Sequence, residues 1–105
     1  MGNVKRLKPA NYASMLRQSY DTPILVVMFA TGCKFCKKAR PILNRFAAEW
    51  VNGRVGYFYD SERFGHKHFR AKDEYPAYML FRHGGVVHRH YGMFEADELK
   101  RFVGA

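Results

Sequence analysis

The most continuous hydrophobic run of the sequence is Ile24–Phe29, which is uninterrupted and rich in β-branched residues. Such a run is typical of a central strand that is buried on both faces. A short polar segment follows it, and apolar residues then recur at helical spacing from Ala39 to Trp50. The pattern therefore predicts a strand that leads through a turn into a helix.

Two elements are predicted before this strand. Val4–Leu7 is a short strand candidate, and Pro9 suits the first turn of a helix. Asp21-Thr22-Pro23 is a turn that ends this helix before the buried strand begins. The helix should bury an approximate stripe made of Ala10, Tyr12, Ala13, Leu16 and Tyr20.

The helix after the central strand contains Pro41, which removes a helical hydrogen bond and should kink it. Gly53 is the expected C-cap of this helix. Val55–Tyr59 then has the composition of a second strand, and Glu62–Ala71 is predicted to be a helix with Phe64, His68 and Ala71 on one face.

The last third of the chain predicts a hairpin and a helix. Ala77–Arg82 is a strong strand candidate, and Gly84-Gly85 should form the hairpin turn into a strand at Val86–Tyr91. Glu95–Val103 is amphipathic, and Leu99, Phe102 and Val103 should face the core. The order of elements predicts an α/β fold with a mixed central sheet of four or five strands flanked by helices.

Length and composition place this fold in one domain spanning residues 1–105. Hydrophobic residues make up 48% of the chain, which indicates a packed protein rather than a disordered one. No apolar run approaches the roughly 20 residues that span a membrane, and Met1–Lys8 lacks the apolar region of a signal peptide. We expect a cytoplasmic monomer without a membrane partner, although an exported mature domain would look the same.

The formal net charge of +9 has two interpretations. It can favour acidic partners or nucleic acid, or it can serve solubility. Lys and Arg are scattered along the whole chain, and Lys37-Lys38 is the longest block near the cysteines. This scatter favours solubility, so a nucleic-acid partner is not expected.

The two cysteines of the chain form the motif Cys33-Lys34-Phe35-Cys36 between the central strand and its helix. Cys33 should lie just before the helix, where free backbone N–H groups and the helix dipole stabilise an anion. A thiolate is the anion that fits there. Two cysteines so close in sequence constrain little of the unfolded chain, so a redox dithiol is the better interpretation.

Each residue of the motif then has a predicted role. Cys33 is the candidate nucleophile, which attacks a substrate disulfide to give a mixed disulfide. Cys36 is the candidate resolving thiol. Lys34, beside Cys33 in sequence, could stabilise the thiolate, whereas Lys37–Arg40 fit an ordinary solvated helix face. The alternative for the pair is a structural role without any substrate.

A metal site is the other chemistry that the sequence raises. His66 and His68 could lie close together on a helix, and His88 and His90 would share one face of a strand. Zinc needs four converging ligands, and neither histidine pair is tied by its spacing to the cysteines. We therefore predict no metal and no bound cofactor, because the dithiol itself carries the electrons.

With these motifs in this order, the chain resembles the thioredoxin superfamily over nearly its whole length. Cys33-Lys34-Phe35-Cys36 occupies the place of the family's Cys-x-x-Cys, and Pro41 matches its helix proline. Tyr75-Pro76 matches the cis-proline loop, and Gly92 matches the glycine of the loop that faces the active site. The resemblance implies the thioredoxin fold and a substrate groove around Cys33, lined by Phe35, Tyr75, Pro76, Tyr91 and Gly92, with Met93 beside them.

The sequence also departs from thioredoxins proper, which carry Trp-Cys-Gly-Pro-Cys. Gly32 precedes the first cysteine here. The buried aspartate that thioredoxins place before the motif corresponds to Val27, and the lysine of their next strand corresponds to Gly56. In the family these two residues are thought to help deprotonate the second cysteine.

The sequence thus predicts a thiol–disulfide oxidoreductase that acts on protein disulfides. Its electrons would be exchanged with a thiol or a reductase that the sequence does not identify. Two other functions compete with this one. One is a binding module that uses the basic face and keeps a non-catalytic cysteine pair, and the other is a metal-binding protein that uses Cys33 and Cys36 with a histidine.

Overall fold

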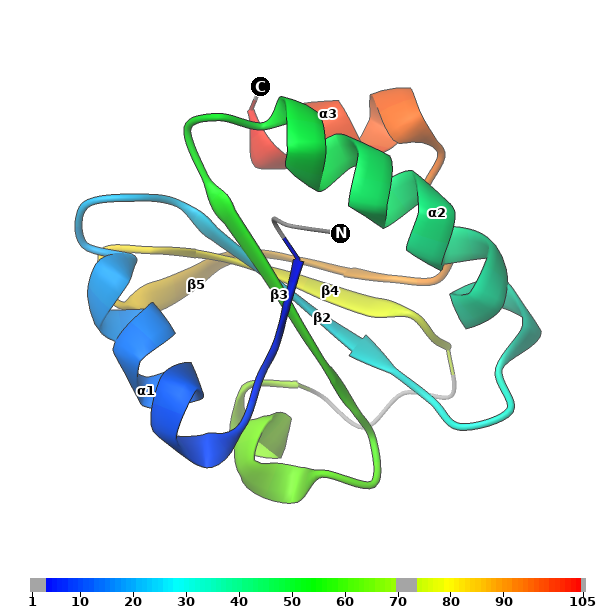
Figure 1. Ribbon diagram of the computed structural model, residues 1–105, viewed down its shortest axis with the longest axis horizontal. Helices are drawn as coiled ribbons and strands as arrows, with labels where there is room; N and C mark the ends of the chain where they lie inside the picture. Colours follow the sequence, from blue (N-terminus) through cyan, green and yellow to red (C-terminus); the bar gives the residue numbers. More distant parts are fainter. Residues whose placement is uncertain (1–3, 70–73, 105) are drawn as a thin grey trace.

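A five-stranded mixed sheet runs through the middle of the computed structural model, which describes residues 4–69 and 74–104 (Figure 1). The strand order is β1-β3-β2-β4-β5. The first three strands are parallel to one another, whereas β4 pairs antiparallel with β2 and β5 pairs antiparallel with β4. The strands are β1 (Val4–Arg6), β2 (Ile24–Phe29), β3 (Arg54–Tyr59), β4 (Ala77–Arg82) and β5 (Gly85–Tyr91). The predicted α/β fold with a mixed sheet is confirmed.

Helices cover both faces of the sheet. The helices α2 (Lys34–Glu49) and α3 (Ala96–Val103) lie above it in Figure 1, and α1 (Pro9–Gln18) lies below it with the 3₁₀ helix η1 (Arg63–His68). Within the described ranges no helix is long and apolar enough to cross a membrane.

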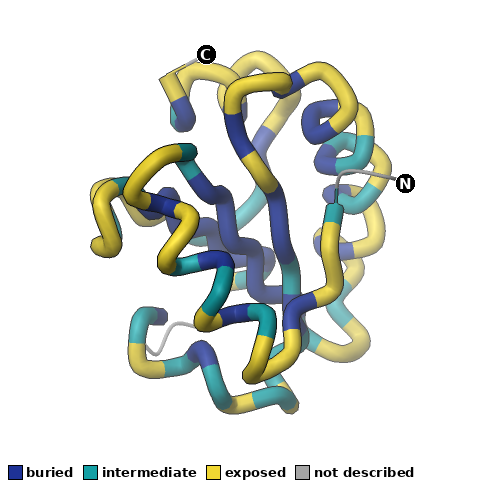
Figure 2. Tube along the Cα trace, turned by 60° about the vertical axis from the view of Figure 1, so that its left-hand side comes forward, coloured by how far each residue is buried: buried dark blue, intermediate teal, exposed yellow. Residues whose placement is uncertain are grey.

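The core consists of two layers separated by the sheet. Every residue of β2 is buried, and successive side chains alternate between the layers because a strand has a period of two. Val27 belongs to the layer under α2 and α3, while Val26 and Met28 belong to the layer over α1. Figure 2 shows these central strands mostly in dark blue and the surrounding loops and outer helix turns in yellow.

The predicted role of Gly53 as a helix cap is wrong. The helix α2 ends at Glu49 with Trp50 as its C-cap, several residues earlier than expected. Gly53 instead lies against the indole of Trp50, and a Cβ atom at this position would come within 2.3 Å of the ring. A glycine stands here because the Trp50 ring, which is 8% exposed, occupies the space of a side chain.

The segment predicted as an α-helix at 62–71 is a short 3₁₀ helix, and Ala71 lies outside the described residues. Gly65, in its middle, packs so closely on Phe58 that a Cβ atom would lie 2.5 Å from the ring. Phe69 leaves the helix in an extended conformation, which places its ring 5.5 Å from that of Phe58. Packing around one aromatic ring therefore decides the shape of this segment.

The hairpin turn lies one residue earlier than predicted. His83 and Gly84 form it, with φ of +54° and +83°, and Gly85 is already the first residue of β5. Positive φ at both central residues is the pattern of a type I′ turn. Ser19, buried at the end of α1, holds the turn: its carbonyl accepts the N–H of His83 at 2.8 Å, and its hydroxyl accepts that of Gly84 at 2.8 Å.

The buried stripe of α1 also differs from the prediction. Tyr12 and Met15 are its buried residues, whereas Tyr20 lies beyond the helix and is 62% exposed. The helix rests on the sheet at a slightly different rotation from that expected, so the small residues Ala10 and Ala13 face outward. In α3, by contrast, Leu99 and Val103 are buried as predicted, and Phe102 is half-buried.

Candidate active site

The cysteines lie where β2 ends and α2 begins, on the right-hand side of Figure 1. The connecting loop turns at Gly32, whose φ of +76° is a conformation that favours glycine. The N–H of Thr31 donates to the Asp60 carboxylate at 3.4 Å, and the N–H of Asp60 donates to the carbonyl of Phe29 at 2.8 Å. The residue after β3 therefore fixes the loop that carries the first cysteine.

Cys33 is the N-cap residue of α2, and Cys36 lies one turn inside the helix, as predicted. The Sγ of Cys33 accepts the backbone N–H of Cys36 at 3.1 Å. A sulfur in this position uses an N–H group that has no partner within the helix, and it lies at the positive end of the helix dipole. The structure thus places the sulfur of Cys33, and not that of Cys36, at the N-terminal end of the helix.

The two sulfurs have different environments. Cys33 is half-buried, whereas Cys36 is 4% exposed and packs in the core layer under α2. Burial raises the pKa of the Cys36 thiol to about 12, and its interaction with Cys33 adds to this shift. Both cysteines are free thiols in this structure. The pair thus combines an accessible sulfur with a protected one that stays protonated at neutral pH.

Two loops from the other half of the sheet meet at Cys33. The Sγ of Cys33 lies 3.8 Å from the carbonyl oxygen of Tyr75, and the peptide bond between Tyr75 and Pro76 is cis. The carbonyl of Pro76 accepts the N–H of Gly92 at 2.9 Å, and Gly92 has a φ of +103°. The loop before β4 and the loop after β5 are therefore joined beside the cysteine.

The other residues predicted for the substrate groove occupy different positions. Phe35 is 55% exposed at the start of α2, and Met93 packs against the same core layer as Cys33. Tyr91 pairs with Ala77 and packs against the opposite layer, over α1. Lys34 is exposed at the first position of α2, and within residues 4–69 and 74–104 no hydrogen bond or ion pair involves its side chain.

The structure places hydrophobic groups where thioredoxins proper would have a buried acid. Val27 is fully buried and lies between Tyr57 of β3 and Tyr78 of β4 in the sheet register. Gly56 lies on the other face, because a Cβ atom there would point at Leu7, 2.9 Å away. Burial raises the pKa of Tyr78, and the nearby Cys36 raises it further. The core layer around Cys36 is therefore aromatic and aliphatic, and the Asp60 carboxylate is the acidic group that acts on its thiol and raises its pKa.

A groove of about 180 Å³ opens beside the cysteines, between the start of α2 and the end of β3. Arg40 spans it, since its guanidinium donates to the Tyr59 hydroxyl at 2.9 Å and lies 5.9 Å from the centre of the Phe29 ring. Arg40 was expected on a solvated helix face, but it is half-buried against Tyr59 and lines this groove. The sequence analysis did not single out Tyr59 or Asp60 as neighbours of the site. Asp60 could have been found, because the carboxyl ends of adjacent parallel strands lie at one edge of a sheet. The groove is lined by Phe29, Ala30, Thr31, Gly32, Cys33, Cys36, Lys37, Arg40 and Tyr59.

No metal-binding group forms among the described histidines, cysteines and acidic residues. His66 instead lies with its Nε2 atom 2.8 Å from the carbonyl of Asp60. His90 stacks on Phe94 with ring centres 3.7 Å apart. These histidines pack against neighbouring residues of their own region.

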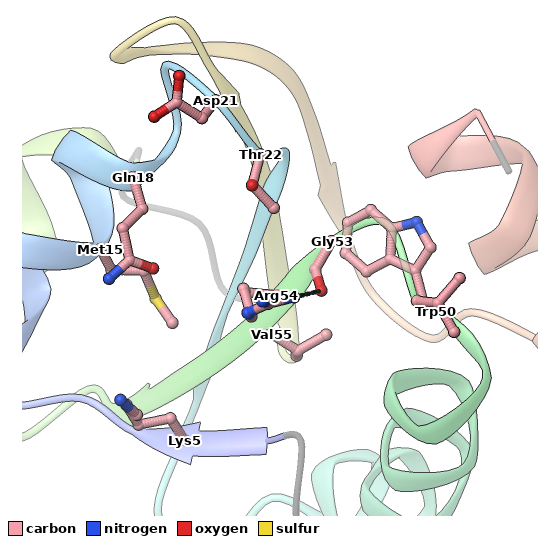
Figure 3. Close-up of a pocket in the computed structure, with 10 residues that line it drawn as sticks. Lys5, Met15, Gln18, Asp21, Thr22, Trp50, Gly53, Arg54 and Val55 are labelled. Carbon is pink, nitrogen blue, oxygen red and sulfur yellow. Dashed lines mark hydrogen bonds between the residues drawn. The ribbon is translucent and has the colours of Figure 1, made fainter.

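A larger cavity of about 810 Å³ lies at the opposite end of the sheet (Figure 3). It is formed where α1 ends, α2 ends and β3 begins, so the length of β2 separates it from the cysteines. The side chain of Arg54 bends back to donate to the carbonyl of Gly53 at 3.0 Å, as Figure 3 shows. The lining of this cavity contains no thiol and no histidine. It comprises Lys5, Met15, Gln18, Asp21, Thr22, Trp50, Val51, Gly53, Arg54 and Val55.

Comparisons with known proteins agree with this fold. The model of the Thioredoxin family matches residues 3–105. Among solved structures, the short form of thioredoxin f from spinach chloroplast is similar with a TM-score of 0.85 at 18% identity, over 98% of this chain and 92% of that one. Reduced thioredoxin pre-protein from Schistosoma mansoni is similar with a TM-score of 0.84 at 16% identity, over 98% and 97% of the two chains. No curated protein sequence matches this one.

Proposed function

The chain belongs to the thioredoxin family, and we propose that it is a thiol–disulfide oxidoreductase that exchanges electrons with disulfides of other proteins through Cys33 and Cys36. The observation that carries this proposal is the difference between the two sulfurs. One is a half-buried N-cap that accepts a backbone N–H at 3.1 Å, and the other is buried inside the first turn of the same helix. An accessible nucleophile and a protected resolving thiol are what such an exchange requires.

In the direction of reduction, the Cys33 thiolate attacks one sulfur of a substrate disulfide. A bond forms between Cys33 and that sulfur, the substrate S–S bond breaks, and the second substrate sulfur leaves as a thiolate that takes up a proton from solvent. The helix N-terminus assists this step because it stabilises Cys33 as the attacking thiolate.

In the second step the Cys36 thiol loses its proton and attacks the Sγ of Cys33. The mixed disulfide breaks, the substrate leaves with two thiols, and the enzyme is left with a Cys33–Cys36 disulfide. Two electrons have then passed from the enzyme to the substrate. Because burial raises the pKa of Cys36 to about 12, its deprotonation is the demanding part of this step.

We place the substrate chain along the loops that meet at Cys33. The carbonyl of Tyr75 lies 3.8 Å from the reactive sulfur, so an extended segment could pair with this backbone in the manner of an added strand. Pro76 and Gly92 hold the loop in place through their mutual hydrogen bond. Phe35 offers an exposed apolar contact in the first turn of the helix that Cys33 caps.

Reduction of insulin with dithiothreitol as the electron source tests the proposal. Wild-type protein should accelerate the precipitation of the reduced insulin B chain over dithiothreitol alone. Cys33→Ser should abolish the acceleration, and Cys36→Ser should accumulate a mixed disulfide with substrate that mass spectrometry can detect. If the wild-type protein gives no acceleration and Cys36→Ser traps no substrate, the proposed activity is wrong.

A further inference from the structure

The first turns of α2, the helix that Cys33 caps, carry several positive charges. This helix carries five basic residues, and its one acidic residue, Glu49, lies at the far end. Glu49 is 3.9 Å from Lys100 of α3, so its charge is directed away from the cysteines. The basic residues are Lys34, Lys37, Lys38, Arg40 and Arg45.

These charges are not neutralised within the described part of the protein. The ion pairs found there join Arg6 to Glu62, Lys100 to Glu49, and Arg101 to Asp97, and none involves a basic residue of α2. The first turn of α2 also contains no acidic residue. Basic side chains at a helix N-terminus oppose the helix dipole, so they do not serve the stability of this helix.

Several of these basic side chains lie at or near the groove that contains the cysteines. Lys37 and Arg40 line the groove that contains Cys33 and Cys36. The Nζ of Lys38 is 5.9 Å from the centre of the Phe35 ring. Lys34, Phe35, Lys37 and Lys38 are all exposed. Positive charge therefore borders the groove of the cysteines, and the exposed ring of Phe35 lies next to the charge of Lys38.

We propose that this surface, made of Lys34, Phe35, Lys37, Lys38 and Arg40 and here called the basic rim, selects substrate proteins whose disulfide is flanked by acidic residues. The inference rests on the proposed function, since it names the substrate class of the same site. An acidic segment would place its carboxylates against Lys37 and Lys38 while an apolar side chain covers Phe35. The disulfide would then lie over Cys33.

Charge complementarity supports this occupant over others. Opposite charges around a site raise the rate of productive encounter and disfavour partners of like charge. The Asp60 carboxylate accepts the Thr31 N–H, Glu62 binds Arg6, and Glu74 has a carboxylate oxygen 3.6 Å from the Cβ position of Gly92. These carboxylates belong to loops outside α2, so a substrate rich in lysine or arginine would still meet repulsion where it contacts α2. With 18 basic and 9 acidic residues, the whole chain adds to the same preference.

The test uses three synthetic peptides that share one intramolecular disulfide loop and differ only in the flanking residues. The flanks are four glutamates, four glutamines or four lysines. Dithiothreitol is the electron source, and kcat/KM is measured for each peptide at two salt concentrations, about 20 mM and about 500 mM. The higher concentration shortens the electrostatic screening length to a few ångströms. At low salt we expect kcat/KM for the acidic peptide to be roughly tenfold higher than for the neutral peptide, and to exceed the value for the basic peptide by a larger factor. At high salt these differences should shrink to about twofold.

A charge-reversal variant, Lys37→Glu with Lys38→Glu, should abolish or invert the preference, which is read within each variant as the ratio of kcat/KM for the acidic peptide to kcat/KM for the neutral peptide. The matched control is Lys5→Glu with Arg17→Glu, which makes the same change in net charge beside the cavity at the other end of the sheet. This control should keep the preference for the acidic peptide. If the control loses the preference as fully as the rim variant, net charge rather than the basic rim is responsible, and the proposal is wrong.

The outcomes separate this inference from the proposed function. Reduction of all three peptides at equal rates overturns the inference and leaves the oxidoreductase activity standing. No reduction of any peptide overturns the proposed function itself. A short single-stranded DNA is tested by fluorescence anisotropy as a competitor. If it binds more tightly than the acidic peptide and the rim variant loses that binding, the surface is a nucleic-acid site and the proposal fails.

Discussion

The Sγ of Cys33 accepts the backbone N–H of Cys36 at 3.1 Å, so the first cysteine caps the helix that carries the second. This single contact gives the two thiols different chemistry. The capping sulfur is half-buried and reaches solvent, whereas the sulfur inside the turn is 4% exposed. The order of events in the proposed reaction follows from that difference.

Alkylation should therefore distinguish the two cysteines. We expect iodoacetamide at neutral pH to modify Cys33 of the reduced protein at least about tenfold faster than Cys36, since reactivity follows thiolate character and exposure. Peptide mapping by mass spectrometry at several times measures both rates. Cys33→Ser provides the control for the intrinsic rate of Cys36. Equal labelling of the two sites in wild-type protein would contradict the assignment of Cys33 as the nucleophile.

The second step of the reaction should depend strongly on pH. Because burial raises the pKa of Cys36 to about 12, its thiolate fraction increases about tenfold with each pH unit below that value. A mixed disulfide between Cys33 and thionitrobenzoate should then release its chromophore about ten times faster at pH 8 than at pH 7. Stopped-flow absorbance measures this rate, and Cys36→Ser gives the background. A rate that levels off below pH 8 would show that Cys36 is far more acidic than its burial implies.

The residues between the cysteines should set the reduction potential. Lys34 places a positive charge beside the Cys33 thiolate, which favours the reduced form. Replacing the pair by Lys34→Gly with Phe35→Pro should lower the potential by tens of millivolts, where about 30 mV corresponds to 1.4 kcal/mol. Equilibration with glutathione buffers measures the change. Arg45→Gln removes a charge farther along α2 and should leave the potential within a few millivolts. An unchanged or higher potential in the double variant would rule out this role for Lys34.

Two glycine substitutions test the packing at the end of α2. Gly53→Ala brings a Cβ atom within 2.3 Å of the Trp50 ring, so overpacking should lower the free energy of unfolding by about 1–3 kcal/mol. Gly85→Ala is the matched control, because no atom lies within 4 Å of its Cβ position. Urea denaturation followed by Trp50 fluorescence measures both variants. Equal stability of the two would mean that the indole moves aside without cost.

Much of the fold could be predicted from local patterns in the sequence. The continuous run Ile24–Phe29 identified the central strand, and the period of the segment after it identified the helix α2. These features are determined locally, because a buried strand and an amphipathic helix each leave their own periodicity. The same reasoning placed Cys33 before the helix and Cys36 inside it, which is most of what the proposed chemistry needs.

The errors arose where the packing of one particular side chain decides the local backbone. The residues around Gly53 predict a helix cap, but the indole of Trp50 occupies the space that a side chain at position 53 would need. The local pattern of the segment after β3 predicts an α-helix, but this segment packs closely on the ring of Phe58, and Phe69 is extended. The hairpin turn was misplaced by one residue, because buried Ser19 of a different element holds His83 and Gly84 in the turn.

At the candidate site, the chemical groups follow from residue identity, whereas their surroundings depend on the folded chain. The motif of Cys33 and Cys36 follows from residue identity and helix geometry alone. Cys33 contacts Tyr75 because the antiparallel strand β4 begins at the edge of the sheet where β2 ends. The groove spanned by Arg40 and the position of Asp60 arise because the parallel strand β3 ends at that same edge. Pairings between residues far apart in the chain leave no periodic trace in a single sequence, which is why only the folded chain shows what the thiols meet.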